Sequence, residues 1–171
     1  MTTDPRFPIG KFQAPDPLSK AEIQQLIQDI KAFPVQVKAE VFRLGAAGLE
    51  KPYRKGGWTG KQVIHHCADS HFNSFIRFKL ALTEDTPTIK PYHEDLWAKQ
   101  IDYQLPIDSS LAILEGLHIR WVALLENLNE MDLRKTFIHP EMKKEIRLDF
   151  TIALYSWHCR HHLGHLRMIS A

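Results

Sequence analysis

The sequence contains only two cysteines, Cys67 and Cys159, in 171 residues, and it lacks a long hydrophobic run. Two cysteines are too few for the disulfide framework of a small secreted protein. No apolar run approaches the roughly 20 residues that a membrane-spanning helix needs, and the N-terminus lacks the basic and then apolar layout of a secretory signal. We therefore expect a cytoplasmic protein with reduced thiols and no membrane contact.

An excess of charge of one sign is also missing. The chain has 22 Lys and Arg against 20 Asp and Glu, a formal net charge of +2, which is too small to indicate a nucleic-acid partner. The sequence shows no glycine-rich phosphate loop, no Ser/His/Asp order and no paired carboxylates. The hydrophobic fraction of 44% is that of an ordinary globular protein, and the length predicts a single domain over residues 1–171.

Capping signals and hydrophobic periodicity predict four helices, at residues 18–44, 60–82, 108–128 and 149 to the C-terminus. The first two starts carry capping-box pairs, Ser19 with Glu22 and Thr59 with Gln62, and the third has a cap at Asp108 or Ser109. Pro34 should kink or break the first helix, because proline cannot donate a backbone hydrogen bond. Four prolines within residues 1–17 predict an extended arm on the surface.

The segments between these helices are unequal in length. Residues 86–105 read as a proline-bounded crossover with a short helix around residues 94–100. Residues 137–148 contain HPEMKKE between two short alternating runs, which predicts a small β-hairpin. The expected fold is therefore all-α, a four-helix bundle with a long crossover and a small hairpin before the last helix.

The most unusual segment is SWHCRHHLGHL, residues 156–166, which holds four of the ten histidines. On a helix with about 100° per residue, these four side chains fall within an arc of roughly 100°, on the face that also carries apolar residues. Burying unpaired imidazoles would cost on the order of 1–3 kcal/mol each. The pattern therefore disfavours a solvent-facing run and leaves a metal site and a hydrogen-bonded core as alternatives.

Metal binding needs more than this segment supplies. His158 with His162, and His161 with His165, are i, i+4 pairs that can converge on one ion, but catalytic zinc typically takes three protein ligands. The second helix offers His65, His66 and His71. Amphipathicity alone would bury His71 and expose His66. Alternatively, His66 and the polar stripe beside it face a hydrated pocket inside the bundle, and the residues alone leave both possibilities open.

Several segments together resemble the DinB/YfiT-like superfamily, in order and over nearly the whole chain: FPIG, YRKGGWTGKQVIHHCADSH, RFKLALTEDTPTIKPY, LHIRWVALL, FIHPE and LYSWHCRHHLGH. They resemble in particular its YfiT branch of metal-dependent hydrolases, which includes bacillithiol S-transferases. The resemblance implies a four-helix bundle, often a homodimer, with a divalent metal ion held by three histidines. Carried over to this sequence, those ligands fall on His66, His158 and His162.

The resemblance also implies a function. It favours a metal-dependent enzyme with an open coordination position, which transfers a low-molecular-weight, bacillithiol-like thiol to an electrophilic small molecule. The alternatives are a hydrolase that uses metal-bound water and a non-catalytic metal-binding module of a stress response. One divalent ion per chain is expected, with zinc or nickel favoured; the sequence identifies no general base.

The remaining candidate residues lie beside the expected ligands. Asn73 and Arg77 share the helix face of His66 and are candidates to bind substrate carboxylates, unless that face is simply solvated. His161 and His165 are expected to surround the site rather than ligate the ion. The two cysteines, each adjacent to an expected ligand, are interpreted as small apolar fillers.

Overall fold

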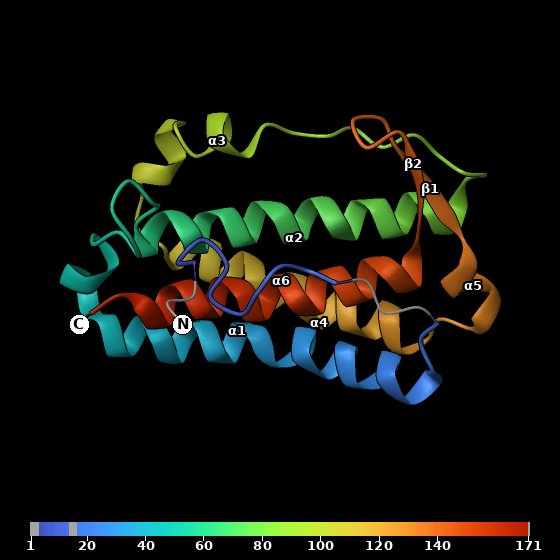
Figure 1. The fold of residues 1–171 in the computed structure, drawn as a ribbon, viewed down its shortest axis with the longest axis horizontal. Coiled ribbons are helices and arrows are strands. Elements are labelled where there is room, and N and C mark those ends of the chain that lie inside the picture. The colour runs from blue at the N-terminus through green and yellow to red at the C-terminus, as the bar shows by residue number, and fades with distance from the viewer. Residues whose placement is uncertain (1–3, 14–16, 171) are drawn as a thin grey trace.

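The fold is known from a computed structural model that describes residues 4–13 and 17–170 (Figure 1). Its four long helices are α1 (Lys20–Leu49), α2 (Gly60–Thr83), α4 (Asp108–Glu126) and α6 (Leu148–Met168). Helix α1 packs against α6 and α4, and α2 packs against the same two helices. The predicted four-helix bundle is therefore confirmed. Within the described ranges, no helix is both long and apolar enough to cross a membrane.

The shorter elements lie between the long helices. A long crossover after α2 carries the one-turn helix α3 (Glu94–Trp97) and a 3-10 helix, η1 (Ile101–Gln104). Helix α5 (Glu130–Arg134), which the sequence did not predict, precedes the antiparallel strands β1 (Thr136–His139) and β2 (Lys144–Arg147). The predicted hairpin before the last helix is confirmed.

Of the three side-chain caps that the sequence predicted, two form. Both predicted capping boxes form, because the side chains of Ser19 and Thr59 accept from the backbone N–H three residues on, and the partner side chain accepts in return. The predicted side-chain cap of α4 is wrong. Asp108 is already the first helical residue, and Ile107 before it makes no side-chain cap bond. The carboxylate of Asp108 lies in the first turn of α4, where the helix dipole favours negative charge.

The first helix does not end at Pro34. Helical structure continues through this residue to Leu49, and the break in the backbone lies at Gly45, with φ 59° and ψ 178°. Glycine adopts this positive φ without the steric cost that a Cβ would impose. The proline removes one hydrogen-bond donor from the helix interior, and the carbonyl that loses its partner finds another, as described below.

The core is unusual in its histidine content. Apolar side chains such as Phe33, Phe78 and Trp121 fill the space between the four long helices. Seven of the ten histidines are also buried: His65, His66, His71, His118, His161, His162 and His165. Because a buried polar ring without a partner is costly, the bundle must supply hydrogen bonds or ligands for these imidazoles.

Two peripheral segments close over the bundle. In Figure 1 the crossover passes along the outer side of α2, and it is fixed at the hairpin, where the Ile89 N–H donates to the Ile138 carbonyl at 3.0 Å. The described part of the predicted N-terminal arm lies along α6, where Trp157 Nε1 donates to the Gly10 carbonyl at 3.2 Å. Residues 1–3 and 14–16 of that arm lie outside the described residues.

Candidate metal centre

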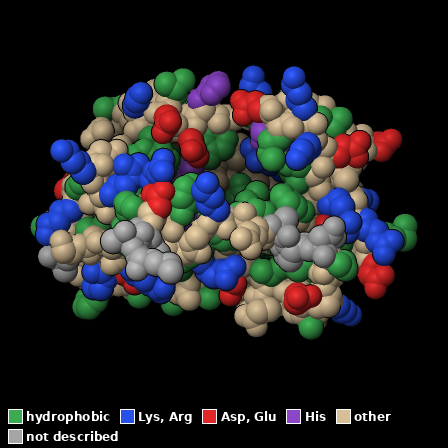
Figure 2. All heavy atoms as spheres, in the orientation of Figure 1, with side chains coloured by type: hydrophobic (Ala, Val, Ile, Leu, Met, Phe, Trp, Pro, Cys, Tyr) green, Lys and Arg blue, Asp and Glu red, His purple; other side chains and the backbone are tan. Residues whose placement is uncertain are grey.

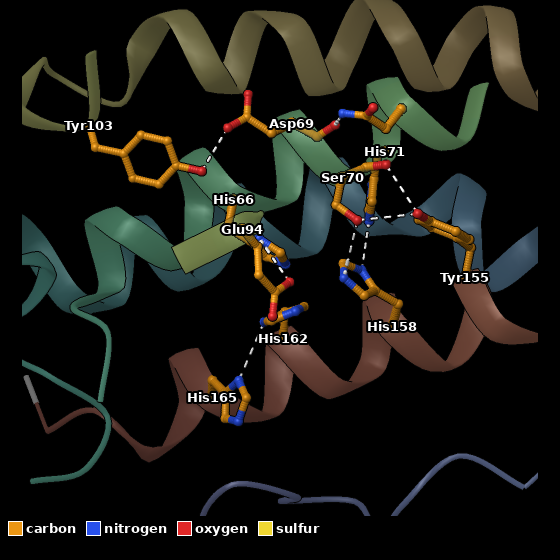
Figure 3. Close-up of polar contacts among 11 residues, drawn as sticks. His66, Asp69, Ser70, His71, Glu94, Tyr103, Tyr155, His158, His162 and His165 are labelled. Carbon is orange, nitrogen blue, oxygen red and sulfur yellow. Dashed lines mark hydrogen bonds and ion pairs between the residues drawn. The ribbon is translucent and has the colours of Figure 1, made fainter. Parts of the chain in front are cut away.

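Three histidines from two helices meet near the N-terminal half of α2. His66 comes from α2, and His158 and His162 come from successive turns of α6 (Figure 3). One ring nitrogen from each lies within 4.8 Å of the others. The ring centroids are 4.8 Å apart for His66 and His162, and 4.4 Å apart for His158 and His162. The structure thus brings together the three residues to which the resemblance assigned the metal.

Local sequence explains this convergence. The capping box at Thr59 fixes where α2 begins, so that His66 lies at the end of its second turn, about 10 Å from the cap. Trp58, which precedes the cap, packs against the His66 ring at a centroid distance of 4.7 Å. On α6, the i, i+4 spacing of His158 and His162 places their rings next to each other on one face of the helix, in an edge-on arrangement.

The three rings are in the form that binds a metal ion. Burial lowers the pKa of His66 to about 4, and it holds the pKa values of His158 and His162 well below the ordinary range; repulsion between neighbouring rings acts in the same direction. They are therefore neutral at pH 7, with a lone pair available. Among the described residues, His66 Nδ1 is buried without a hydrogen-bond partner. This set of neutral, partly unsatisfied nitrogens fits a divalent cation.

A cavity of about 390 Å³ opens beside the three histidines. Its walls include Trp58 and Trp157, and its rim carries both signs of charge: Arg6, Arg54, Glu94 and Asp95. Figure 2 shows basic and acidic side chains gathered on this face of the molecule. Arg54 Nε is buried and has no hydrogen-bond partner among the described residues. An anionic small molecule could bind there next to the histidines.

Glu94 is a site residue that sequence analysis missed. The crossover helix α3 places its Oε2 atom 3.9 Å from His66 Nδ1 (Figure 3). No spacing or motif connects a residue in a one-turn helix with a histidine 28 positions earlier. The contact follows only from the path of the crossover over α2.

A second group of nitrogens overlaps the first. His161, His162 and His165 also place one ligand atom each within 4.8 Å of the others, and the Nδ1 atoms of His162 and His165 are 3.3 Å apart. His165 stacks on Tyr53 with a centroid distance of 4.0 Å, and His161 stacks on Trp157 at 4.4 Å. His161 and His165 lie beside the three proposed ligands, and His162 is common to both groups.

The structure does not bring Asn73 and Arg77 to this cavity. Asn73 Nδ2 donates to the Asp69 carbonyl at 2.9 Å on its own helix, and Arg77 lies near His139 of the hairpin, whose pKa is lowered by burial and then by the Arg77 charge. Both residues share the helix face of His66, but they are about 10 and 16 Å further along the axis. Helical periodicity predicts a face and says nothing about which part of that face borders a cavity.

The sequence left open whether His66 faces solvent while His71 is buried, or whether His66 faces a pocket inside the bundle. Each of these alternatives is correct in part. His66 and His71 are each almost fully buried, because α2 contacts α6 on one side and α4 on another. His71 is part of the core, as amphipathicity predicted, whereas His66 borders the cavity. The two cysteines are buried and free of disulfides, and burial raises the pKa of both, so they stay protonated and are poor metal ligands.

Comparisons with known proteins identify similar chains in Bacillus species. Relatives from Bacillus cereus (strain ATCC 10987) and Bacillus thuringiensis subsp. konkukian are each 51% identical over 163 residues, which cover 95% of this chain and 94% of the relative. Both are provisionally named metal-dependent hydrolases. YfiT from Bacillus subtilis, a solved structure provisionally assigned as a metal-dependent hydrolase with an unusual four-helix bundle topology, matches with a TM-score of 0.92 and 42% identity over 95% of this chain and 94% of that one.

A more distant solved structure shares the fold alone. The mycothiol-dependent maleylpyruvate isomerase superposes with a TM-score of 0.66 at 15% identity, over 87% of this chain and 61% of that one. The family model described as the DinB superfamily matches residues 37–166. Because this match spans most of the chain and the relatives above cover nearly all of it, the chain belongs to the DinB superfamily.

Proposed function

We propose that this protein is a divalent-metal-dependent enzyme whose ion is held by His66, His158 and His162. The observation that carries this proposal is the convergence of three neutral imidazoles from two helices at the wall of an open cavity. Three protein ligands leave a coordination position for a substrate, whereas a structural site would be closed by four. A purely structural metal site is therefore less well supported.

The proposed reaction transfers a low-molecular-weight thiol to an electrophilic small molecule. A divalent ion bound at the three histidines would lower the pKa of a thiol that reaches it. The guanidinium of Arg54, at the rim of the same cavity, would bind a carboxylate of an anionic thiol and orient it. The side chains of Trp58 and Trp157 line the same cavity and would contact the apolar parts of the two substrates.

The proton of the thiol needs an acceptor, and His161 is the candidate. Burial and then the repulsion of His165 lower its pKa to about 4, so the ring is neutral at pH 7. Its Nδ1 is buried and has no hydrogen-bond partner in the described part of the chain. Because this ring lies in the cavity lining with the proposed ligands, it is placed to pass the thiol proton on to solvent, and with a pKa of about 4 it does not retain that proton at pH 7.

Hydrolysis is the second candidate, and the names of the relatives favour it. Both reactions use the same three histidines, and they differ in whether a thiol or a water molecule is the nucleophile. The fold itself also houses a mycothiol-dependent enzyme, so the architecture accommodates a thiol co-substrate. Arg54 at the cavity favours thiol transfer over hydrolysis. An anionic thiol has a carboxylate for the guanidinium to bind, whereas a water nucleophile has none.

The test combines metal content with a thiol panel. The purified chain, loaded with zinc or nickel, would be assayed with bacillithiol, cysteine and glutathione against a chlorobimane electrophile, with and without chelator. We expect thiol conjugation that chelator abolishes. A panel without metal-dependent turnover, accompanied by metal-dependent ester or amide hydrolysis, would contradict transfer and establish hydrolysis.

Single alanine variants separate the two overlapping histidine groups. His66→Ala and His158→Ala should each abolish stoichiometric metal binding, measured by plasma emission, while circular dichroism shows an intact bundle. The matched variant His161→Ala should keep its metal. The opposite pattern, with metal lost in His161→Ala and kept in His158→Ala, would assign the ion to the second group and contradict the site proposed here.

A further inference from the structure

Pro34 removes one backbone hydrogen bond from the interior of α1. In a regular helix the N–H of residue 34 would donate to the carbonyl of residue 30, but Pro34 has no N–H. Ile30 is fully buried, and an unpaired buried carbonyl would be costly. His118, which comes from α4, supplies the missing donor: its Nδ1 lies 2.8 Å from the Ile30 carbonyl oxygen.

This contact fixes the position of the proton on His118. A carbonyl oxygen can only accept a hydrogen bond, so Nδ1 must carry the proton. In a neutral imidazole the other nitrogen then has the lone pair. His118 Nε2 must therefore accept, and the atom it faces is His71 Nδ1, at 2.8 Å.

The tautomer of His71 in turn fixes the tautomer of His158. Since His71 Nδ1 donates, His71 Nε2 accepts, and His158 Nδ1 lies 3.1 Å from it. His158 Nδ1 therefore carries its proton, and His158 Nε2 is left with a lone pair. The hydroxyl of Ser70, with its Oγ 3.4 Å from Nε2, can donate to that lone pair while no ion is bound, and an ion would replace this contact. His118, His71 and His158 thus form a series of hydrogen-bonded histidines that starts at the Ile30 carbonyl. All contacts in this series are compatible with one set of tautomers.

We propose that His118 and His71 are positioning residues that hold His158 in its Nδ1-protonated tautomer, so that its Nε2 lone pair is available to the metal ion. This inference rests on the metal site proposed above. In the opposite tautomer, Nε2 would carry a hydrogen and could not bind the ion. A ligating histidine typically donates its other N–H to a partner that fixes its tautomer, and here the partner is itself a histidine.

The neighbouring aromatic rings keep this series in place. Phe33 of α1 stacks on His118 with a centroid distance of 5.7 Å and an interplanar angle of 25°. Trp121 packs edge-on against both His71 and His118. The series runs from α1 through α4 and α2 to α6, so the readiness of one ligand depends on the packing of all four long helices.

The experiment uses two variants and a matched control. His118→Phe keeps a planar ring but removes both hydrogen bonds. In His118→Asn the amide nitrogen can take the place of His118 Nδ1 and donate to the Ile30 carbonyl. The shorter side chain has no atom at the position of His118 Nε2, so His71 Nδ1 loses its acceptor. The control is His65→Phe, on the same helix as His71 and also buried. Its ring nitrogens lie 2.7 Å from Ser110 Oγ and 3.2 Å from the Leu105 carbonyl oxygen, outside the series.

Two readouts apply to each protein. Nitrogen-15 NMR of the histidine rings, recorded on the metal-free chain at pH 7.5, identifies the tautomer of His158. Competition with a chromophoric chelator measures zinc affinity. We expect the wild type and the control to show the Nδ1-protonated form of His158. Both His118 variants should show the Nε2-protonated form in addition, with zinc affinity reduced about 10- to 100-fold.

The outcomes separate this inference from the proposed function. Nε2-protonated His158 in the metal-free wild type would overturn the inference, and so would unchanged tautomers in both His118 variants. If the wild type binds no zinc but its tautomer is Nδ1-protonated and changes in the variants, the series stands and the metal site fails. If His118→Phe does not fold, His118→Asn decides, because it retains the bond to α1.

Discussion

Burial of His118 should make the metal-free protein less stable in acid. The side chain is 2% exposed, and this burial lowers its pKa from 6.5 to about 4, although the bond to the Ile30 carbonyl raises it slightly. Between these two values the unfolded chain binds more protons than the folded chain. The free energy of unfolding therefore rises with pH across this window and is lost as the pH falls from 6.5 to about 4.

The magnitude follows from the two pKa values. Between pH 7.5 and pH 5.0, a group with these values contributes about 2 kcal/mol to the pH dependence of unfolding. His118→Phe cannot titrate, so its stability should fall by about 2 kcal/mol less than that of the wild type over this interval. Comparing differences between the two pH values cancels any change that the substitution makes in packing.

The assay is urea unfolding of the metal-free chain, followed by circular dichroism at several values of pH from 7.5 to 5.0. A chelator is present throughout, so that metal release does not add to the slope. His93→Asn is the control, because His93 is exposed, and it should show the wild-type slope. Parallel stability curves for His118→Phe and the wild type would refute the reasoning that a neutral buried ring at this position opposes protonation.

Two further predictions concern the proposed metal site. Thr59→Ala should cost about 1 kcal/mol of stability in a thermal or urea unfolding experiment, because it removes the capping bond at the start of the helix that carries His66; an unchanged midpoint would contradict this. Glu94→Gln should weaken zinc binding, measured by chelator competition, without unfolding the bundle, because it removes the negative charge 3.9 Å from His66 Nδ1. Its neighbour Asp95, changed to Asn, is the matched control, and equal affinities for both variants would remove the assigned role of Glu94.

Much of the fold could be predicted from local sequence patterns. The capping boxes at Ser19 and Thr59 act through side chains only three residues away, and periodicity and turn signals identified the four long helices and the hairpin. The error at Pro34 has a cause outside the first helix. Gly45, rather than Pro34, interrupts the first helix, because glycine reaches a backbone conformation closed to other residues whereas a lost donor can be replaced from another helix.

Only part of the candidate site could likewise be predicted from the sequence. The i, i+4 spacing and the resemblance to the DinB/YfiT-like superfamily pointed to His66, His158 and His162, and the coordinates place these rings together. Spacing within one helix could not predict that Asn73 and Arg77 lie away from the cavity, because a helical face extends further than the pocket it borders. Nor could it predict Glu94, which reaches the site through a crossover.

The sequence by itself determined the four long helices, their order and the face on which the last four histidines lie, because these depend on interactions between residues a few positions apart. Only the tertiary structure decided which imidazoles border the cavity and which hydrogen-bond in the core. Those roles depend on contacts between helices: His118 with Ile30, and His71 with both His118 and His158. An imidazole that donates through one nitrogen and accepts through the other has the position of its proton fixed by neighbours distant in sequence, and no local pattern encodes those neighbours.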